Sequence, residues 1–185
     1  MRVCTGRFRG RALQYPRAGL RPTKDVTRQA MFNMLGGRVA GARVCDLYAG
    51  GGSLGIEALS RGACSAVLVE QSGVVLRYLR ANLAGIENAR VVRGDVLKAL
   101  RRMAGEQFDI ILADPPYRQS LVQVTVELVA ELGLLASGGR LVVEHDRAEG
   151  PRVPSGWRVA ARGKYGESRV TIMTNGGQED ESGEE

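Results

Sequence analysis

The chain has 185 residues, of which 44% are hydrophobic and 25% charged, and its formal net charge at pH 7 is +6. These values are typical of one globular domain, and no apolar run reaches the roughly 18 residues of a membrane-spanning helix. Three scattered cysteines, a single histidine and the lack of an apolar N-terminal segment argue against a disulfide framework, a metal cluster and a secretion signal. We therefore expect a reduced, metal-free, cytoplasmic protein.

The N-terminal part of the chain predicts a small β-hairpin and then a helix. Glycines interrupt residues 3–14 at positions suited to a turn, so we expect the hairpin there. Apolar residues at helical spacing follow within residues 21–37, with Thr23 as the candidate N-cap and two glycines at the end.

From residue 43 onward, short apolar runs alternate with segments of helical periodicity. We expect strands over residues 43–48, 65–70, 89–94, 108–113 and 139–146, and helices over residues 53–62, 73–85, 95–103 and 120–135. Residues 156–174 predict two further strands joined near Gly163 to Gly166. This alternation is typical of an α/β fold with a doubly wound, mostly parallel seven-stranded sheet, a C-terminal antiparallel hairpin and a small N-terminal hairpin and helix extension.

A glycine-rich loop follows the first strand of this sheet and leads directly into a helix. Gly50, Gly52 and Gly55 match the pattern G-x-G-x-x-G in the strand–loop–helix context that binds nucleoside cofactors. Glu70 ends the next strand, at the distance expected of an acid that holds ribose hydroxyls. The sequence therefore predicts a nucleoside-bearing cofactor.

Acidic residues beside this loop bear on the identity of the cofactor. Asp46 lies at the end of the first strand, where it would repel the diphosphate of a dinucleotide but would suit an ammonium and a sulfonium group. Asp95, at the end of the third strand, either adds an acceptor near the adenine or is a plain helix N-cap. These acids favour S-adenosylmethionine over NAD, and NAD stays open.

The fourth strand ends in the sequence ADPPY, where Asp114 and Tyr117 flank two prolines that cannot donate backbone hydrogen bonds. Asp114 and the carbonyl of Pro115 are suited to accept the two N–H bonds of an exocyclic amine, and Tyr117 to stack on the base that carries it. The prolines, including Pro116, keep these acceptors rigid. In this position the motif predicts methylation of a planar amine, in which the protein mainly positions the reactants.

Together these motifs resemble class I S-adenosylmethionine-dependent methyltransferases of the amino type, whose motif is Asp/Asn-Pro-Pro-aromatic. More closely, LRPTKDVTRQAMFNML, DLYAGGGSLGIEALSRGA, ADPPY and KYGES resemble the RsmD-type family. That family methylates N2 of a guanine in 16S ribosomal RNA. The resemblance runs from about Arg7 to about Ile172 and departs from the family pattern at Val26 and Gln29.

The resemblance implies roles for particular residues. It implies cofactor binding by Asp46, Tyr48, Gly50, Gly52, Gly55, Glu70, Asp95, Val96 and Thr23. It implies catalysis by Asp114, Pro115, Pro116 and Tyr117, with no metal. It also implies that the partner is 16S ribosomal RNA or the small ribosomal subunit, and we expect a monomer that does not bind membranes.

The charge pattern agrees with an RNA partner. Residues 1–43 hold ten Lys or Arg and one acid, which is either a solvated basic face or a surface for phosphates. The residues that we expect to contact RNA are Arg7, Arg9, Arg11 and Arg21. We accordingly divide the chain into a basic extension (1–42), a methyltransferase domain (43–175) and an acidic, disordered tail (176–185).

Three other functions remain as alternatives. The proline motif also suits amino-methyltransferases that act on adenine N6 in DNA or RNA, or on a protein glutamine. The glycine loop also suits a nicotinamide-dependent oxidoreductase, against which Asp46 and the proline motif count. A catalytically inactive RNA-binding module is the third, and the complete set of motifs from Asp46 to Tyr117 counts against it.

Overall fold

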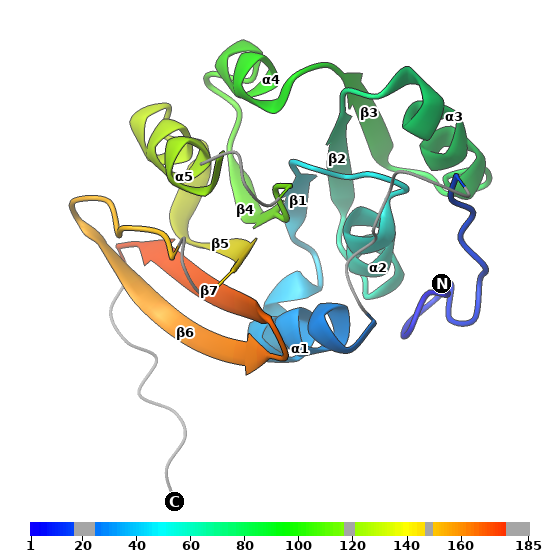
Figure 1. Cartoon of the computed structure of the whole chain (residues 1–185), viewed down its shortest axis with the longest axis horizontal. Helices are drawn as coiled ribbons and strands as arrows, with labels where there is room; N and C mark the ends of the chain where they lie inside the picture. Colours follow the sequence, from blue (N-terminus) through cyan, green and yellow to red (C-terminus); the bar gives the residue numbers. More distant parts are fainter. Residues whose placement is uncertain (17–24, 117–120, 147–149, 177–185) are drawn as a thin grey trace, which may run out of the picture.

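The computed structural model describes residues 1–16, 25–116, 121–146 and 150–176, and its centre is one seven-stranded sheet (Figure 1). The strands lie in the order β3-β2-β1-β4-β5-β7-β6. In chain order they are β1 (Arg43–Asp46), β2 (Ser65–Glu70), β3 (Ala89–Arg93), β4 (Phe108–Ala113), β5 (Leu135–His145), β6 (Trp157–Tyr165) and β7 (Ser168–Asn175). The first five are parallel, and β7 runs antiparallel to both β5 and β6. The predicted α/β fold is therefore confirmed.

Helices cover both faces of the sheet, because the central strands are apolar on both sides. One hydrophobic cluster contains Val44 and Ile110 together with residues of α1 (Asp25–Leu35), α2 (Ser53–Ser60) and α3 (Gly73–Asn82). The other contains the neighbouring residues Cys45 and Ile111 with residues of α4 (Val96–Arg102) and α5 (Leu121–Glu131). Alternate residues of each strand thus belong to opposite layers, as the pleat requires.

The strand order reverses between β1 and β4, which are hydrogen-bonded neighbours. Asp46, the last residue of β1, lies opposite Leu112 of β4, two residues before Asp114. In doubly wound sheets such a reversal opens a crevice beyond the carboxyl ends of the strands, where ligands bind. The fold therefore brings the two predicted motifs to the same crevice.

Several element boundaries differ from the sequence-based expectations, and β5 begins at Leu135 rather than at residue 139. The helix expected to reach residue 135 ends at Glu131, because Gly133 has a φ of +61° and the N–H of Leu134 donates back to the carbonyl of Val129. Gly163 is not in the turn between β6 and β7 but inside β6, and the strands are joined by Gly166 and Glu167.

The N-terminal hairpin, which we call the arm (residues 1–16), lies across α2 and α3. Its two halves form a single antiparallel bridge between Arg2 and Ala12, and Val3 and Leu13 pack against Ile56 of α2. At its turn the N–H of Arg7 donates to the carbonyl of Ser60 at 2.8 Å. The hairpin is thus confirmed, and its turn rests on the C-terminal end of α2.

A buried ionic cluster fixes the arm to the helices beneath it. Glu57 of α2 is fully buried and accepts hydrogen bonds from the N–H of Cys4 and from Nε of Arg61, each at 2.8 Å. Arg28 of α1, also fully buried, lies 3.9 Å from the same carboxylate and donates to the carbonyl of Arg2. Because buried charges are stable only when paired, this cluster ties the position of the arm to that of α1 and α2.

In the part of the chain that the structure describes, no helix is long and apolar enough to cross a membrane.

Candidate functional site at the carboxyl ends of the strands

The glycine loop after β1 has a conformation that requires its glycines. Gly50 and Gly52 have φ values of +54° and +88°, a backbone conformation that is unfavourable for residues with a Cβ atom. Gly52 is also the N-cap of α2. A Cβ on Gly55 would lie 2.6 Å from Cδ2 of Leu68, so a larger residue would force the buried Leu68 side chain to move. The three glycines of the predicted motif thus shape the turn and the approach of helix to strand.

Asp46 lies beneath this loop and carries an unusual buried carboxyl group. It is 1% exposed, and its Oδ2 accepts a hydrogen bond from the N–H of Gly55 at 2.9 Å. Its Oδ1 is buried and has no hydrogen-bond partner among the described residues. Burial raises the pKa of Asp46 from 3.8 to about 7, the Gly55 N–H opposes this shift, and the nearby Glu70 adds to it. A cation bound nearby would stabilise the ionised form.

Glu70, at the end of β2, joins two loops at the rim of the crevice. Its Oε2 accepts the N–H of Gly50 at 3.0 Å, and its Oε1 accepts the N–H of Ser72 at 2.6 Å. The side chain is half-buried. Each carboxylate oxygen can accept a further hydrogen bond, so Glu70 can receive hydroxyl groups of a ribose while it holds the loops.

The remaining predicted cofactor residues take more varied positions. Tyr48 is half-buried, and its hydroxyl lies 2.7 Å from Oγ1 of Thr125 on α5. Asp95 is the N-cap of α4 and accepts the N–H of Lys98 at 3.0 Å, so the helix-capping interpretation of this residue is confirmed. Val96, the first residue of α4, is buried in the second of the two hydrophobic clusters. Thr23 lies outside the described residues.

The arm supplies contacts to the glycine loop that sequence reasoning missed. Nδ2 of Asn82, the last residue of α3, donates to the carbonyls of Gly51 and Gln14, each at 2.9 Å. The ring of Tyr15 covers Gly51 so closely that a Cβ there would lie 2.4 Å from Tyr15 Cε1. No motif marks these residues, since they meet only when the arm folds over α3.

The proline motif begins where β4 ends, next to β1. Asp114 is half-buried, Pro115 is buried and Pro116 is exposed. Tyr117 lies outside the described residues, as does Arg21. The described part of the motif therefore begins directly after β4, on the strand next to the one that leads into the glycine loop.

The predicted RNA-contacting residues of the arm do not gather at this crevice. Arg7 and Arg9 are exposed beside Ser60, at the far end of α2 from the glycine loop. Eight helical residues separate the two ends, or about 12 Å. Arg11 donates to the carbonyl of Ala84, which follows α3. These arginines thus form a basic area at a distance from the crevice.

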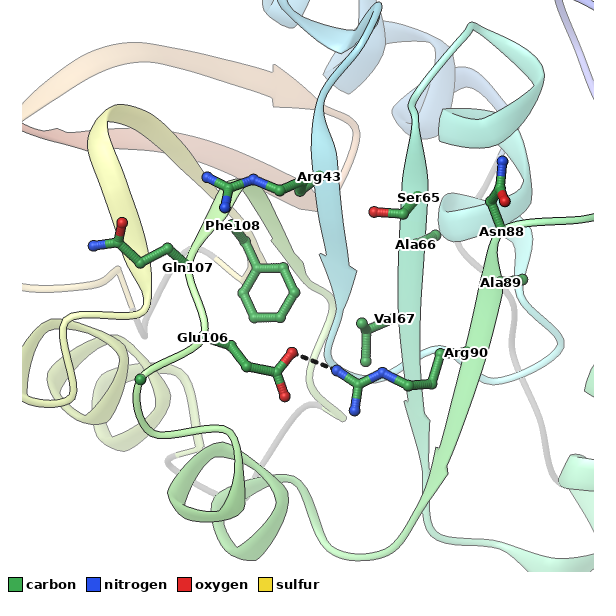
Figure 2. Close-up of a pocket in the computed structure, with 11 residues that line it drawn as sticks. Arg43, Ser65, Ala66, Val67, Asn88, Ala89, Arg90, Glu106, Gln107 and Phe108 are labelled. Atoms are coloured by element: carbon green, nitrogen blue, oxygen red, sulfur yellow. Dashed lines mark hydrogen bonds and ion pairs between the residues drawn. The ribbon is translucent and has the colours of Figure 1, made fainter.

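A groove of about 610 Å³ lies at the opposite edge of the sheet, at the amino ends of the strands (Figure 2). Its arginines are paired with acids: Arg43 with Asp109 at 2.9 Å, and Arg90 with Glu106. The groove therefore has no uncompensated charge among these pairs, and it is remote from the glycine loop. We do not assign the site to it. Among the residues described, no cluster of three His, Cys, Asp or Glu is placed to hold a metal ion.

Comparison with known proteins places this geometry in a family. The model of the family described as "Conserved hypothetical protein 95" matches residues 1–174. "Ribosomal RNA small subunit methyltransferase D" of Escherichia coli K12 is 39% identical over 163 residues, which cover 86% of this chain and 82% of that protein. Its counterpart in Haemophilus influenzae is 31% identical and 86% of each chain is covered. The solved structure of yhhF from Escherichia coli is 33% identical with a TM-score of 0.87, covering 96% of this chain and 99% of that chain.

Proposed function

The chain belongs to the RsmD-type family of methyltransferases, and we propose that it transfers a methyl group from S-adenosylmethionine to the exocyclic N2 amine of a guanine in small-subunit ribosomal RNA. One observation carries the proposal: Asp114 and the glycine loop lie at the ends of adjacent strands, on either side of the strand-order reversal. The relatives named as ribosomal RNA small subunit methyltransferases support the substrate class.

The residues around the glycine loop fit a cationic nucleoside donor. Asp46 offers a buried carboxyl oxygen without a partner among the described residues, which suits a positively charged ligand better than a diphosphate. Glu70 has acceptors for a ribose, and Asp95 lies at the rim beyond β3. When bound, S-adenosylmethionine supplies a methyl group activated by its sulfonium. The residues proposed to hold it are Asp46, Tyr48, Gly50, Gly52, Gly55, Glu70, Asp95, Val96 and Thr23.

The proline motif is proposed to position the amine. The carboxylate of Asp114 and the carbonyl oxygen of Pro115 accept its two N–H bonds, which turns the nitrogen lone pair toward the methyl group. Asp114 is also the acceptor for the proton that the amine loses after transfer. Pro116 stiffens the turn, and Tyr117 stacks on the base, which must leave its helical stack to reach the crevice.

The basic N-terminal region is proposed to hold the RNA. Residues 1–42 would form the RNA-contacting extension, in which Arg7, Arg9, Arg11 and Arg21 neutralise phosphates, and residues 43–175 the methyltransferase domain. Either naked 16S RNA or the assembled small subunit is then the substrate.

The proposal is tested with radiolabelled S-adenosylmethionine and unmodified small ribosomal subunits, in parallel with their naked RNA, followed by nucleoside analysis. We expect label in N2-methylguanosine, and the better acceptor identifies the recognised form. Label in N6-methyladenosine would support methylation of an exocyclic amine but would show that the target base is adenine rather than guanine. If no label enters RNA, calorimetric titration with S-adenosylhomocysteine separates a wrong substrate from a wrong cofactor.

A further inference from the structure

The antiparallel strands at the end of the sheet carry a group of basic side chains on one face. Lys164 of β6 lies directly opposite Arg169 of β7, and Arg162 lies opposite Thr171 two positions along. Directly opposed residues and residues two apart share a face, so all three cations project from the same side of the sheet. Arg162 and Lys164 are exposed and Arg169 is half-buried. We call these three residues the β6–β7 basic face.

The pairing of Lys164 with Arg169 opposes the stability of the hairpin. Cross-strand neighbours on one face have Cβ atoms about 5 Å apart, and like charges at that distance repel each other. Arg169 is nevertheless held in place, since its Nη1 donates to the carbonyls of Gly166 and Ser168 at 3.0 and 3.2 Å. The acid nearest in sequence is Glu167, an exposed residue in the turn itself. Residues 162–169 hold these three cations and one acid, so this end of the hairpin is positively charged, as an anion-binding surface requires.

The basic face lies at the same edge of the sheet as the proline motif. The last residue of β5, His145, pairs with Arg169, and β5 runs parallel to β4. The β6–β7 turn therefore lies beyond the carboxyl ends of the strands, next to the crevice. With neighbouring strands about 4.8 Å apart, β7 is about 10 Å from β4, which ends at Ala113, the residue before Asp114.

We propose that Arg162, Lys164 and Arg169 contact the phosphates of the substrate RNA beside the target nucleotide, forming a second RNA-binding surface besides the arm. This inference rests on the proposed function. The arm lies over α2 and α3, on the β2 side of the crevice, whereas the β6–β7 basic face lies on the β5 side, where β6 is the edge strand (Figure 1). RNA bound at Asp114 would then be held on both sides of the crevice.

His145 of β5 and Thr171 of β7 are buried neighbours of the β6–β7 basic face. Nε2 of His145 lies 2.9 Å from Oγ1 of Thr171, and its Nδ1 lies 2.7 Å from the carbonyl oxygen of Asp146. Both side chains are buried, and Thr171 is the cross-strand neighbour of Arg162. These contacts hold β5 and β7 together directly beside the cations, so that the face is rigid before RNA binds.

The test compares two double variants that remove the same charge. Arg162→Gln with Lys164→Gln changes the exposed part of the basic face. Arg101→Gln with Arg102→Gln is the matched control, because both residues are exposed at the end of α4, toward the other edge of the sheet. The binding of unmodified small-subunit RNA is measured by filter retention over a range of salt concentrations, together with the affinity for S-adenosylhomocysteine.

For the first pair we expect a loss of RNA affinity of about tenfold at low salt and a salt slope smaller by about 1 to 2, with unchanged cofactor affinity. The control pair removes the same net charge, so any change that it causes in the RNA affinity or the salt slope measures the general effect of that charge. We expect its changes to be clearly smaller than those of the first pair. Equal effects of the two pairs would overturn the inference and leave the proposed function standing. An edge strand can also use Lys and Arg to prevent aggregation, and a variant that self-associates but binds RNA as before would assign them that role instead. If the parent protein binds and methylates no RNA, it is the proposed function that fails.

Discussion

The side-chain amide of Asn82 donates one hydrogen bond to the carbonyl of Gly51 and another to the carbonyl of Gln14, each at 2.9 Å. Its Oδ1 accepts the N–H of Gln14 at 2.8 Å. One buried residue thus joins the arm, α3 and the glycine loop. Hydrogen bonds therefore link the arm to the loop that we propose to bind the cofactor.

Replacement of this residue should therefore affect cofactor binding. Asn82→Ala removes three hydrogen bonds, at a cost of about 3 kcal/mol in the free energy of unfolding. We expect the Kd for S-adenosylhomocysteine, measured by calorimetry, to rise about tenfold. Arg80→Ala, an exposed change on the same helix, is the control. Loss of stability with an unchanged Kd would show that Asn82 only holds the fold together.

The buried carboxyl of Asp46 should make stability depend on pH. Its pKa is raised from 3.8 to about 7 by burial, so the folded protein holds this proton more tightly than the unfolded chain does. The stability that the proton provides is present at pH 4 and is lost as the pH rises through 7. Asp46→Asn, which keeps an acceptor for Gly55, should raise the melting temperature of the cofactor-free protein by about 3 °C or more at pH 8 and little at pH 4.

The same carboxyl should make binding of a cationic cofactor depend on pH in the opposite sense. S-adenosylmethionine favours ionised Asp46, whose pKa is about 7, so the affinity contributed by this group increases between pH 6 and pH 8. We expect the Kd ratio of Asp46→Asn to parent to change about tenfold over this range. The variant is the necessary reference, because the α-amino group of the cofactor titrates nearby. A constant ratio would contradict a charge interaction at Asp46.

Gly6 and Gly10 are a matched pair of glycines with which the contact between the arm turn and α2 can be tested. Both have a φ of +83°, but a Cβ on Gly6 would lie 1.7 Å from the carbonyl oxygen of Ser60, whereas nothing lies within 4 Å of one on Gly10. Gly10→Ala should cost about 1 kcal/mol, from backbone strain alone. Gly6→Ala should cost more or detach the arm, because backbone atoms cannot move aside. Urea unfolding measures both, and equal costs would mean that the arm turn does not rest on α2.

Asp114, which follows β4, and Asp109, near the start of β4, together test the proline motif. Asp114→Ala should abolish methyl transfer while the Kd for S-adenosylhomocysteine changes less than twofold, because we propose that the carboxylate holds the amine rather than the cofactor. Asp109→Asn, at the other end of β4, loses an exposed ion pair with Arg43 and should keep full activity. Transfer assays under saturating cofactor separate the two variants. Turnover of Asp114→Ala near the parent rate would disprove the proposed geometry of the amine.

The order of helices and strands was predictable from the sequence, because it depends on local periodicity and on turn residues. The strand over residues 65–70 and the glycine loop before α2 appear as expected. Periodicity also predicted the parallel sheet, whose strand ends bring Asp46 and Glu70 to one crevice. Boundaries failed where a hydrogen bond or a pairing register decided them, as at Glu131 and Gly163.

Relationships between distant residues were decided only by the tertiary structure. The sequence marks Asp46 as an acid, but its burial, and with it the raised pKa, comes from packing between the loop and β2. The sequence shows that the arm is basic. The close contact of Gly6 with Ser60, however, places Arg7 and Arg9 away from the crevice. The contact of Asn82 with Gly51 and the pairing of Lys164 with Arg169 likewise depend on how packed helices and strand register bring residues together. Local sequence determines the tendency of each segment to form a helix, a strand or a turn. These contacts exist only after the segments have packed, because burial and hydrogen bonding then select one arrangement.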